Sequence, residues 1–381
     1  MKVEASSLSA LRNRTSEKWT EFPPDVLPMP VAEMDFELAQ PIRDRLIEMI
    51  NNSDTGYMGE TQHLGHHFSE FASKYWNWII KPDQLYLCAD VGVGMIEMAR
   101  TIVSPGAKIM INAPVYLNMF NWIREVKCEI YDAPLHKDGM HYTLDFAAIE
   151  EGYKAGVKIH FLCNPQNPTG TVHTRDELTM LAELAYKYDV YVFSDEIHAP
   201  MVFNESVFTP FLSVSAEARE IGVCVTAASK AWNLAGLKCA FIITESDRIN
   251  SLAKSMPHSV RFRASLFGAH AAAVAYECTD WLEALKETLD RNREFLYVQL
   301  QRKLPQAKYR IPNCSYLAWI DVSAYDLGVH PASTILKRGK LALTPGHLFG
   351  ADCDQFVRLN YATSEEIIAE GIDRIVASLN N

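Results

Sequence analysis

The sequence has no apolar run that approaches about 18 residues, the length that an ordinary membrane-spanning helix needs. Its first ten residues lack the apolar segment of a secretory signal, so we expect a cytoplasmic protein that does not enter a membrane. Basic residues are outnumbered, because 36 lysines and arginines face 47 aspartates and glutamates, for a net charge of -11. This balance argues against a nucleic-acid-binding protein, which needs a basic surface to neutralise phosphates.

Several signature motifs are absent as well. The eight cysteines include no CxxC pair and several fall inside apolar runs, so we expect reduced, buried thiols rather than a disulfide framework. There is no GxxxxGKS/T run, which weakens the case for a nucleotide hydrolase, and no HExxH. A metal site is not expected, although some residues have helical spacing that could assemble ligands. We interpret them as a solvated or subunit-interface helix face: His63, His66, His67 and Glu70.

What the sequence does contain is the pattern of an α/β protein. Its 381 residues predict two domains, and the 48% of apolar residues are enough for a large core. In the middle of the chain, apolar strand-like segments alternate with helical patterns, at 84–89, 108–112, 158–163, 190–194, 222–226 and 239–244. A helix between the third and fourth segments begins at a capping box formed by Thr174 and Glu177. The alternation predicts a mostly parallel central sheet.

The character of the sequence changes near residue 269. Two helical patterns and two strand-like segments follow, at 281–289, 291–304, 315–321 and 356–360. They are typical of a smaller α+β unit, which the N-terminal residues would complete. We therefore predict a large domain of residues 46–270 and a small domain of residues 1–45 and 271–381.

Three polar residues follow or end strands of the predicted sheet. Asn167 follows one strand, Asp195 ends the next, and Lys230 follows a third. Because ligands of an open parallel sheet bind beyond the carboxyl ends of its strands, we expect these side chains at one edge. A partly desolvated lysine can form a Schiff base with an aldehyde cofactor, and an ionised aspartate can keep the ring nitrogen of pyridoxal phosphate protonated. Taken singly, Lys230 could equally be a solvated loop residue and Asp195 a strand cap.

A phosphate group needs backbone N–H donors at the start of a helix. The run from Asp90 to Gly94 follows a predicted strand and opens a helical pattern, which suits that role. It is not a dinucleotide fingerprint, because Glu97 stands where the third glycine of GxGxxG belongs. A nicotinamide dehydrogenase is therefore disfavoured.

The order of these motifs resembles the fold-type I pyridoxal-phosphate enzymes of the class I/II aminotransferase superfamily, whose fold is aspartate aminotransferase-like. Within it, the sequence is most similar to the cystathionine β-lyase (cysteine-S-conjugate β-lyase) branch. The matching segments span almost the whole chain, at 25–36, 56–57, 114–116, 164–170, 194–200, 226–239 and 356–360. The stretch from Ser229 to Ala240 is the most specific of them.

The resemblance implies a role for each matching residue around the ring of pyridoxal 5'-phosphate. Lys230 would bind the cofactor covalently and move protons in catalysis. Asp195 would pair with the pyridine nitrogen, and Asn167 would contact the phenolic oxygen. Tyr116 would stack on the ring, with a core tyrosine as the alternative. His198 would lie near the cofactor or be a structural histidine.

The resemblance also implies how the phosphate is held. Its contacts would come from the amides of Val93 and Gly94, from Ser229 and from Lys238. Lys238 stands where many aminotransferases have arginine, and a lysine binds phosphate as a point charge without the bidentate fork. Tyr57 matches a tyrosine that reaches the phosphate from a neighbouring subunit, which implies a homodimer with shared active sites.

On the substrate side, Arg358 matches the arginine that binds the α-carboxylate as a bidentate pair, with a surface salt bridge as the alternative. The sequence departs from the branch at Pro30, where tryptophan is usual, and at Ala227, which lacks a hydroxyl that some relatives use on the phosphate. Residues 343–346 replace a frequent Asn-Asp-Gly. These departures concern substrate preference more than cofactor use.

The implied reaction is β-elimination from a small amino-acid substrate with a sulfur leaving group, giving a thiol, pyruvate and ammonia. Lys230 would remove the Cα proton as general base. An aminotransferase would use the same lysine, aspartate and arginine but return the proton to the cofactor, so it stays as the alternative. A non-catalytic regulator with this fold is a third hypothesis, and the intact residue set argues against it.

Overall fold

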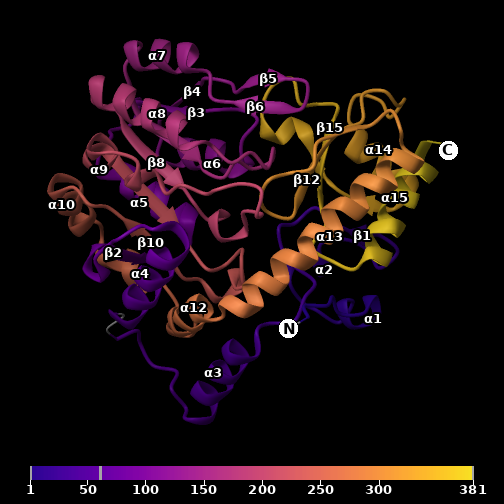
Figure 1. Cartoon of the computed structure of the whole chain (residues 1–381), viewed down its shortest axis with the longest axis horizontal. Coiled ribbons are helices and arrows are strands. Elements are labelled where there is room, and N and C mark those ends of the chain that lie inside the picture. Colours follow the sequence, from indigo (N-terminus) through magenta and orange to yellow (C-terminus); the bar gives the residue numbers. More distant parts are fainter. Residues whose placement is uncertain (1, 60–61, 380–381) are drawn as a thin grey trace.

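The large sheet at the centre of the molecule has seven strands, in the spatial order β2-β10-β9-β8-β7-β3-β4 (Figure 1). The computed structural model describes residues 2–59 and 62–379. The strands are β2 (Leu85–Cys88), β3 (Lys108–Ile111), β4 (Glu129–Asp132), β7 (Val157–Cys163), β8 (Tyr191–Asp195), β9 (Gly222–Thr226) and β10 (Ala240–Ile243). Neighbours from β9 to β4 are parallel, whereas β10 is antiparallel to both β9 and β2. The predicted mostly parallel sheet is confirmed.

Alternate residues along the strands face two helical layers, which explains why the strands are apolar on both sides. In β9, Val223 and Val225 share a core with α5 (Val91–Arg100) and α6 (Leu117–Glu125). Cys224 belongs to the other core, which includes α8 (Arg175–Lys187). α8 begins after Thr174, whose side chain and that of Glu177 form the predicted capping box.

Most of the remaining elements before residue 279 are helices. The N-terminal elements α1 (Leu8–Leu11), α2 (Glu17–Thr20) and β1 (Leu27–Pro28) lie on the side of the C-terminal part of the chain rather than around the large sheet (Figure 1). The helix α12 contacts both α3 and α4. The other helices and short strands are α3 (Gln40–Asn51), α4 (Gln62–Trp76), α7 (Phe146–Lys154), α9 (Ala216–Ile221), α10 (Asp247–Ser255), α11 (His258–Phe262), α12 (Leu266–Glu277), β5 (His136–Asp138) and β6 (His141–Thr143). Single 3-10 turns are η1 (Pro82–Gln84), η2 (Ala199–Met201), η3 (Phe211–Ser213) and η4 (Ala235–Leu237).

A second, antiparallel sheet lies beside the long helix α13 (Thr279–Lys303), which joins the two predicted helical patterns into one (Figure 1). Its order is β11-β12-β15-β14. The elements of this part are β11 (Lys308–Tyr309), β12 (Leu317–Asp321), α14 (Pro331–Gly339), β13 (Leu341–Ala342), β14 (Thr344–Pro345), η5 (Gly346–Phe349), β15 (Phe356–Asn360) and α15 (Glu365–Leu379). The N-terminal strand β1 pairs with β13. We retain 46–270, and 1–45 with 271–381, as the proposed domain division.

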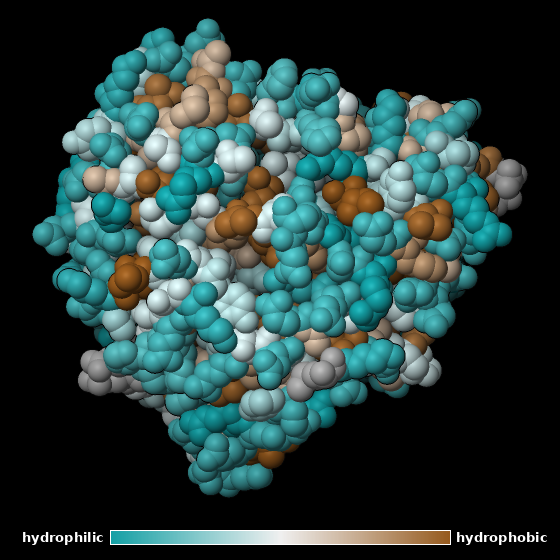
Figure 2. Space-filling model, in the orientation of Figure 1, coloured by the Kyte–Doolittle hydropathy of each residue, from teal (hydrophilic) through white to brown (hydrophobic). Residues whose placement is uncertain are grey.

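The surface in Figure 2 is mainly hydrophilic, with separate small hydrophobic patches. In the described part of the chain, no helix combines the length and apolar character that crossing a membrane requires. All eight cysteines are free, and all except Cys128 are buried.

Candidate active site

The carboxyl ends of β2, β3, β7, β8 and β9 meet at one edge of the large sheet, because these strands all run in the same direction. Asn167 follows β7, Asp195 is the last residue of β8, and Lys230 follows β9. Tyr116 comes after β3, and the run from Asp90 comes after β2. The strand directions thus bring together five segments that are distant in the sequence.

Lys230 is partly buried, and its amine forms a hydrogen bond with a backbone carbonyl. Its Nζ donates to the oxygen of Ala32 at 2.9 Å, and the hydroxyl of Tyr316 donates to the same oxygen at 3.1 Å. Burial, and after it the positive charge of Arg358, lower the pKa of Lys230 to about 8. A fixed amine with this pKa is partly neutral near pH 7, as a nucleophile or general base must be.

Asp195 is a buried carboxyl group without a cationic partner in direct contact. Its Oδ1 accepts from the amide of Ile197 at 3.2 Å. Burial raises the pKa of Asp195 to about 7, although the Ile197 amide and the charge of Lys230 both act to lower it. Among residues 2–59 and 62–379, Asp195 forms no ion pair. Because a buried carboxylate is costly alone, this side chain fits a protonated ring nitrogen as its missing partner.

Arg358 on β15 is only 4% exposed, which excludes a surface salt bridge. Its Nη1 donates to Asn167 Oδ1 at 3.1 Å. Its Nη2 donates to the Pro30 oxygen at 3.0 Å and to Thr344 Oγ1 at 3.2 Å, and the ring of Phe349 lies 5.0 Å from the guanidinium. Within the described residues its buried Nε has no partner and no carboxylate pairs with it. A buried guanidinium of this kind fits a carboxylate that arrives with the substrate.

Tyr116 and His198 complete the group of side chains near Lys230 and Arg358. The Tyr116 hydroxyl accepts from Asn118 at 2.7 Å, and burial raises its pKa. His198 shares a hydrogen bond of 3.1 Å with the hydroxyl of Ser315. Burial and the charges of Lys230 and Arg358 lower the pKa of His198 to about 3, so its imidazole stays neutral.

Three of the predicted phosphate contacts converge on Asp90. Asp90 caps α5: Val93 N donates to its Oδ1 at 2.9 Å, and Gly94 N donates to its carbonyl at 3.0 Å. Its Oδ2 lies 3.3 Å from Nζ of Lys238. A phosphate here would compete with the Asp90 carboxylate for Val93 N and Lys238 Nζ, and with the Asp90 carbonyl for Gly94 N. Ser229 lies in the turn before Lys230, where its carbonyl accepts from Leu234 N.

Tyr57 and the histidines of α4 have other surroundings. The Tyr57 side chain is 91% exposed, and its ring makes an edge contact with Phe262. His63 stacks on His270 with ring centroids 4.7 Å apart. His67 pairs with Glu277 at 3.0 Å, so both histidines contact α12 rather than each other.

Residues that sequence reasoning missed hold the predicted ones in place. Thr344 and Phe349 contact Arg358, and Ala32 and Tyr316 position Lys230. Thr344 lies in a segment noted only as a departure from the branch. The carbonyl of Ala32 carries no signal in the sequence, because every residue has a backbone carbonyl.

A lysine, an aspartate and an arginine gathered at the carboxyl edge of a mostly parallel sheet define an α/β protein with an enzyme-like site. The chain belongs to the aminotransferase class I and II family, whose model matches residues 29–375. This finding confirms the resemblance seen in the sequence.

The relatives extend over the whole chain. A Mycobacterium tuberculosis protein is 36% identical, over 99% of this chain and 98% of its own length. The cystathionine β-lyase of Corynebacterium glutamicum is 31% identical, over 98% of this chain and 99% of its own. The crystal structure of cystalysin from Treponema denticola, which contains pyridoxal 5'-phosphate, superposes with a TM-score of 0.92 at 25% identity, covering 100% of this chain and 99% of that one.

Proposed function

We propose that this protein is a pyridoxal-phosphate-dependent carbon–sulfur lyase that performs β-elimination on cystathionine or related cysteine S-conjugates. The observation that carries the cofactor and the amino-acid substrate is the pair of unmatched buried charges in the site, and the relatives favour elimination over amino transfer. Asp195 is a buried acid without a cation, and Arg358 is a buried cation without a carboxylate. Within residues 2–59 and 62–379, no other side chain pairs with either group to supply the missing charge. Both requirements are met by an amino-acid substrate on a pyridine cofactor, and the relative from Corynebacterium glutamicum carries the name of this activity.

The residues present fit the cofactor. When bound, pyridoxal phosphate supplies an electron-poor ring that stabilises negative charge at the substrate Cα. Lys230 would hold it covalently, Asp195 would face its ring nitrogen, and the amide nitrogen of Asn167 would donate to its phenolic oxygen. Because Asn167 Oδ1 already accepts from Arg358, the amide orientation leaves its nitrogen as the free end.

Arg358 would orient the substrate through its α-carboxylate. Burial lowers the pKa of Arg358 to about 10, so the guanidinium keeps its charge near neutral pH. Lys230, released as a free amine, would then take the Cα proton. With the Cα proton on Lys230 and the Cβ–S bond broken, the sulfur would leave as a thiolate, and the remaining three-carbon fragment would take up water to give pyruvate and ammonia. The imidazole of His198 stays neutral, so it adds no positive charge near Lys230 and Arg358.

The proposal includes a homodimer in a cytoplasmic setting. The 91% exposure of the Tyr57 side chain supports a contact with a second copy, since a large aromatic side chain is seldom left in solvent without a partner. Eight free cysteines support a reducing compartment. Mixing a Tyr57→Phe chain with a Lys230→Ala chain tests the shared site: mixed dimers should regain activity that neither parent has, and no regain contradicts it.

Product analysis tests the lyase directly. The purified protein should release pyruvate from cystathionine catalytically, without any 2-oxo acid acceptor. Activity that strictly requires 2-oxoglutarate would overturn the lyase in favour of an aminotransferase.

Two lysine variants provide the matched control. Lys230→Ala should lose the borohydride-reducible link to the cofactor and all turnover. Lys238→Ala should keep the reducible link and bind the cofactor more weakly. Full activity in Lys230→Ala would refute the assignment of this lysine.

A further inference from the structure

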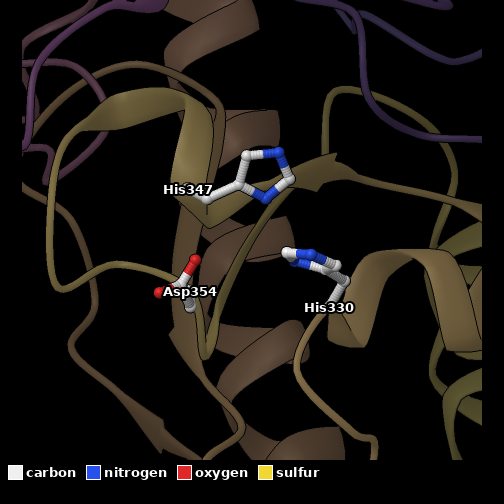
Figure 3. A group of neighbouring side chains, drawn as sticks. All are labelled: His330, His347 and Asp354. Atoms are coloured by element: carbon white, nitrogen blue, oxygen red, sulfur yellow. The ribbon is translucent and has the colours of Figure 1, made fainter.

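We propose that the C-terminal part of the chain carries a surface site for one divalent cation of the zinc type, formed by His330, His347 and Asp354 (Figure 3). One ligand atom from each residue lies within 4.8 Å of the other two. The two imidazole ring centroids are 5.0 Å apart. Two imidazole nitrogens and one carboxylate oxygen are a common zinc ligand set, and water would take the fourth position.

The required adjustment is small. A tetrahedral zinc ion with ligands at about 2.0–2.2 Å needs ligand atoms roughly 3.4 Å apart, so the side chains must close by at most about 1.4 Å. All three side chains are exposed, and Figure 3 shows them converging from separate segments. Rotation of exposed side chains can therefore close the site without a change of the backbone.

The first ligand sits at a rigid helix start. His330 is the N-cap residue of α14 and is followed by Pro331, the first residue of the helix. The carbonyl of His330 accepts from the amides of Ser333 and Thr334 at 3.0 and 3.2 Å. The preceding loop is tied to the segment of Asp354, because Gln355 Nε2 donates to the carbonyls of residues 328 and 329 at 3.2 and 3.4 Å. These bonds hold His330 and Asp354 near each other without any ion.

The second and third ligands are brought together by Gly346. A Cβ atom at this position would lie 2.0 Å from the Cys353 oxygen and 2.5 Å from the Phe356 oxygen. The backbone of η5 therefore packs directly on the turn that carries Asp354, which places the neighbouring His347 over that carboxylate. A prearranged backbone of this kind lowers the cost of assembling a metal site.

The ligand atoms are free to bind. Throughout residues 2–59 and 62–379, none of these three side chains has a hydrogen bond or an ion pair. The histidines of α4 differ, because His67 already pairs with Glu277 and His63 stacks on His270. An ion on His347 would also fix η5, whose last residue, Phe349, lies against Arg358.

Titration of the tag-free, chelator-treated holoenzyme with Zn²⁺ in a calorimeter tests the site. We expect saturable binding of one equivalent and a higher Tm with the ion present. Each of His330→Ala, His347→Ala and Asp354→Asn should weaken binding by at least about tenfold, since even outer-sphere changes cost about 10–100-fold. His141→Ala, which removes an exposed histidine of β6, is the matched control and should bind like the parent.

Cobalt(II) serves as a second probe and separates this site from the cysteines. Nitrogen and oxygen ligation gives ligand-field bands, whereas thiolate ligation adds an intense charge-transfer band. We expect the former without the latter, and loss of these bands in a His330→Ala/His347→Ala double variant. The proposal is overturned by the absence of saturable binding, by a thiolate band, or by unchanged affinity and Tm increase in the double variant.

Discussion

Replacement of Arg358 by glutamine should impair substrate recognition far more than folding. The guanidinium is buried and, in the described part of the chain, its charge has no carboxylate partner until the substrate arrives. Truncating one member of a buried charge pair costs about 2–5 kcal/mol. The loss in kcat/KM should therefore be roughly 30- to 5,000-fold. The free protein should keep its Tm, because glutamine removes an unpaired buried charge and can still donate to the Pro30 carbonyl.

Arg293 offers a matched control. It is buried like Arg358, at 5% exposed against 4%, but it pairs with carboxylates of its own, Glu205 and Asp290. Arg293→Gln should therefore lower Tm and leave KM nearly unchanged. The contrast separates the loss of a buried arginine in general from the loss of the one that meets the substrate.

The assay for Arg358→Gln compares an S-alkyl cysteine with its carboxamide, by the initial rate of thiol release. The variant should lose most of its kcat/KM on the acid and little on the amide, because the amide has no carboxylate to bind. An equal loss on both substrates would refute the reasoning, since it would mean that Arg358 does not recognise the carboxylate.

Three further perturbations test the electrostatics. Lys230 must be neutral to act as a base, and burial lowers its pKa to about 8, so initial rates should rise with pH and level off above about 8. Lys18 and Asp35 form an ion pair at 2.8 Å with both side chains 1% exposed, so Lys18→Met should lower the free energy of unfolding by about 3–5 kcal/mol in urea titrations. Burial raises the pKa of Glu196 from 4.5 to about 7. The protonated Glu196 carboxyl therefore stabilises the fold fully below pH 4.5, and this stabilisation is lost as the pH rises through about 7. The Glu196→Gln variant should not lose stability in this way, so the Tm of the variant minus that of the parent should grow as the pH rises from acid to neutral. A constant difference would contradict this prediction.

Most strands of the large sheet were predictable, because burial on both faces gives a strand a run of apolar residues in the sequence. The strands β9 and β15 were predicted with the bounds that the structure has. The edge strand β4 was missed, because it begins and ends with the exposed residues Glu129 and Asp132 and so lacks the apolar run. Asp195 and Lys230 were predictable for the same reason as the strands, since Asp195 ends one buried strand and Lys230 follows another.

The contacts that position these residues were not predictable, because they depend on backbone atoms and on tertiary packing. Lys230 is bonded to the carbonyl of Ala32, and Arg358 to the carbonyl of Pro30. No residue type encodes a carbonyl. Asp90 was visible as a residue before a helix, but its pairing with Lys238 requires the turn after β9 to return to α5.

Residues 30–36 form a segment that several side chains fix from different parts of the chain. Asn360 donates to the carbonyls of residues 31 and 33 at 2.7 and 2.6 Å. Asn233 exchanges two hydrogen bonds with the backbone of Met34, at 2.9 and 3.0 Å. The buried ion pair between Lys18 and Asp35 holds the C-terminal end of the segment.

This segment couples the two halves of the site, because its carbonyls bind both Lys230 and Arg358. A displacement of the segment would move the amine that takes the proton together with the guanidinium that orients the substrate. Variants that loosen it, such as Lys18→Met, should therefore change kcat and KM together, whereas Arg358→Gln acts mainly through the lost contact with the substrate carboxylate. Elimination and amino transfer differ in where Lys230 returns its proton, so the placement of this amine by Ala32 and Tyr316 bears on the choice between them.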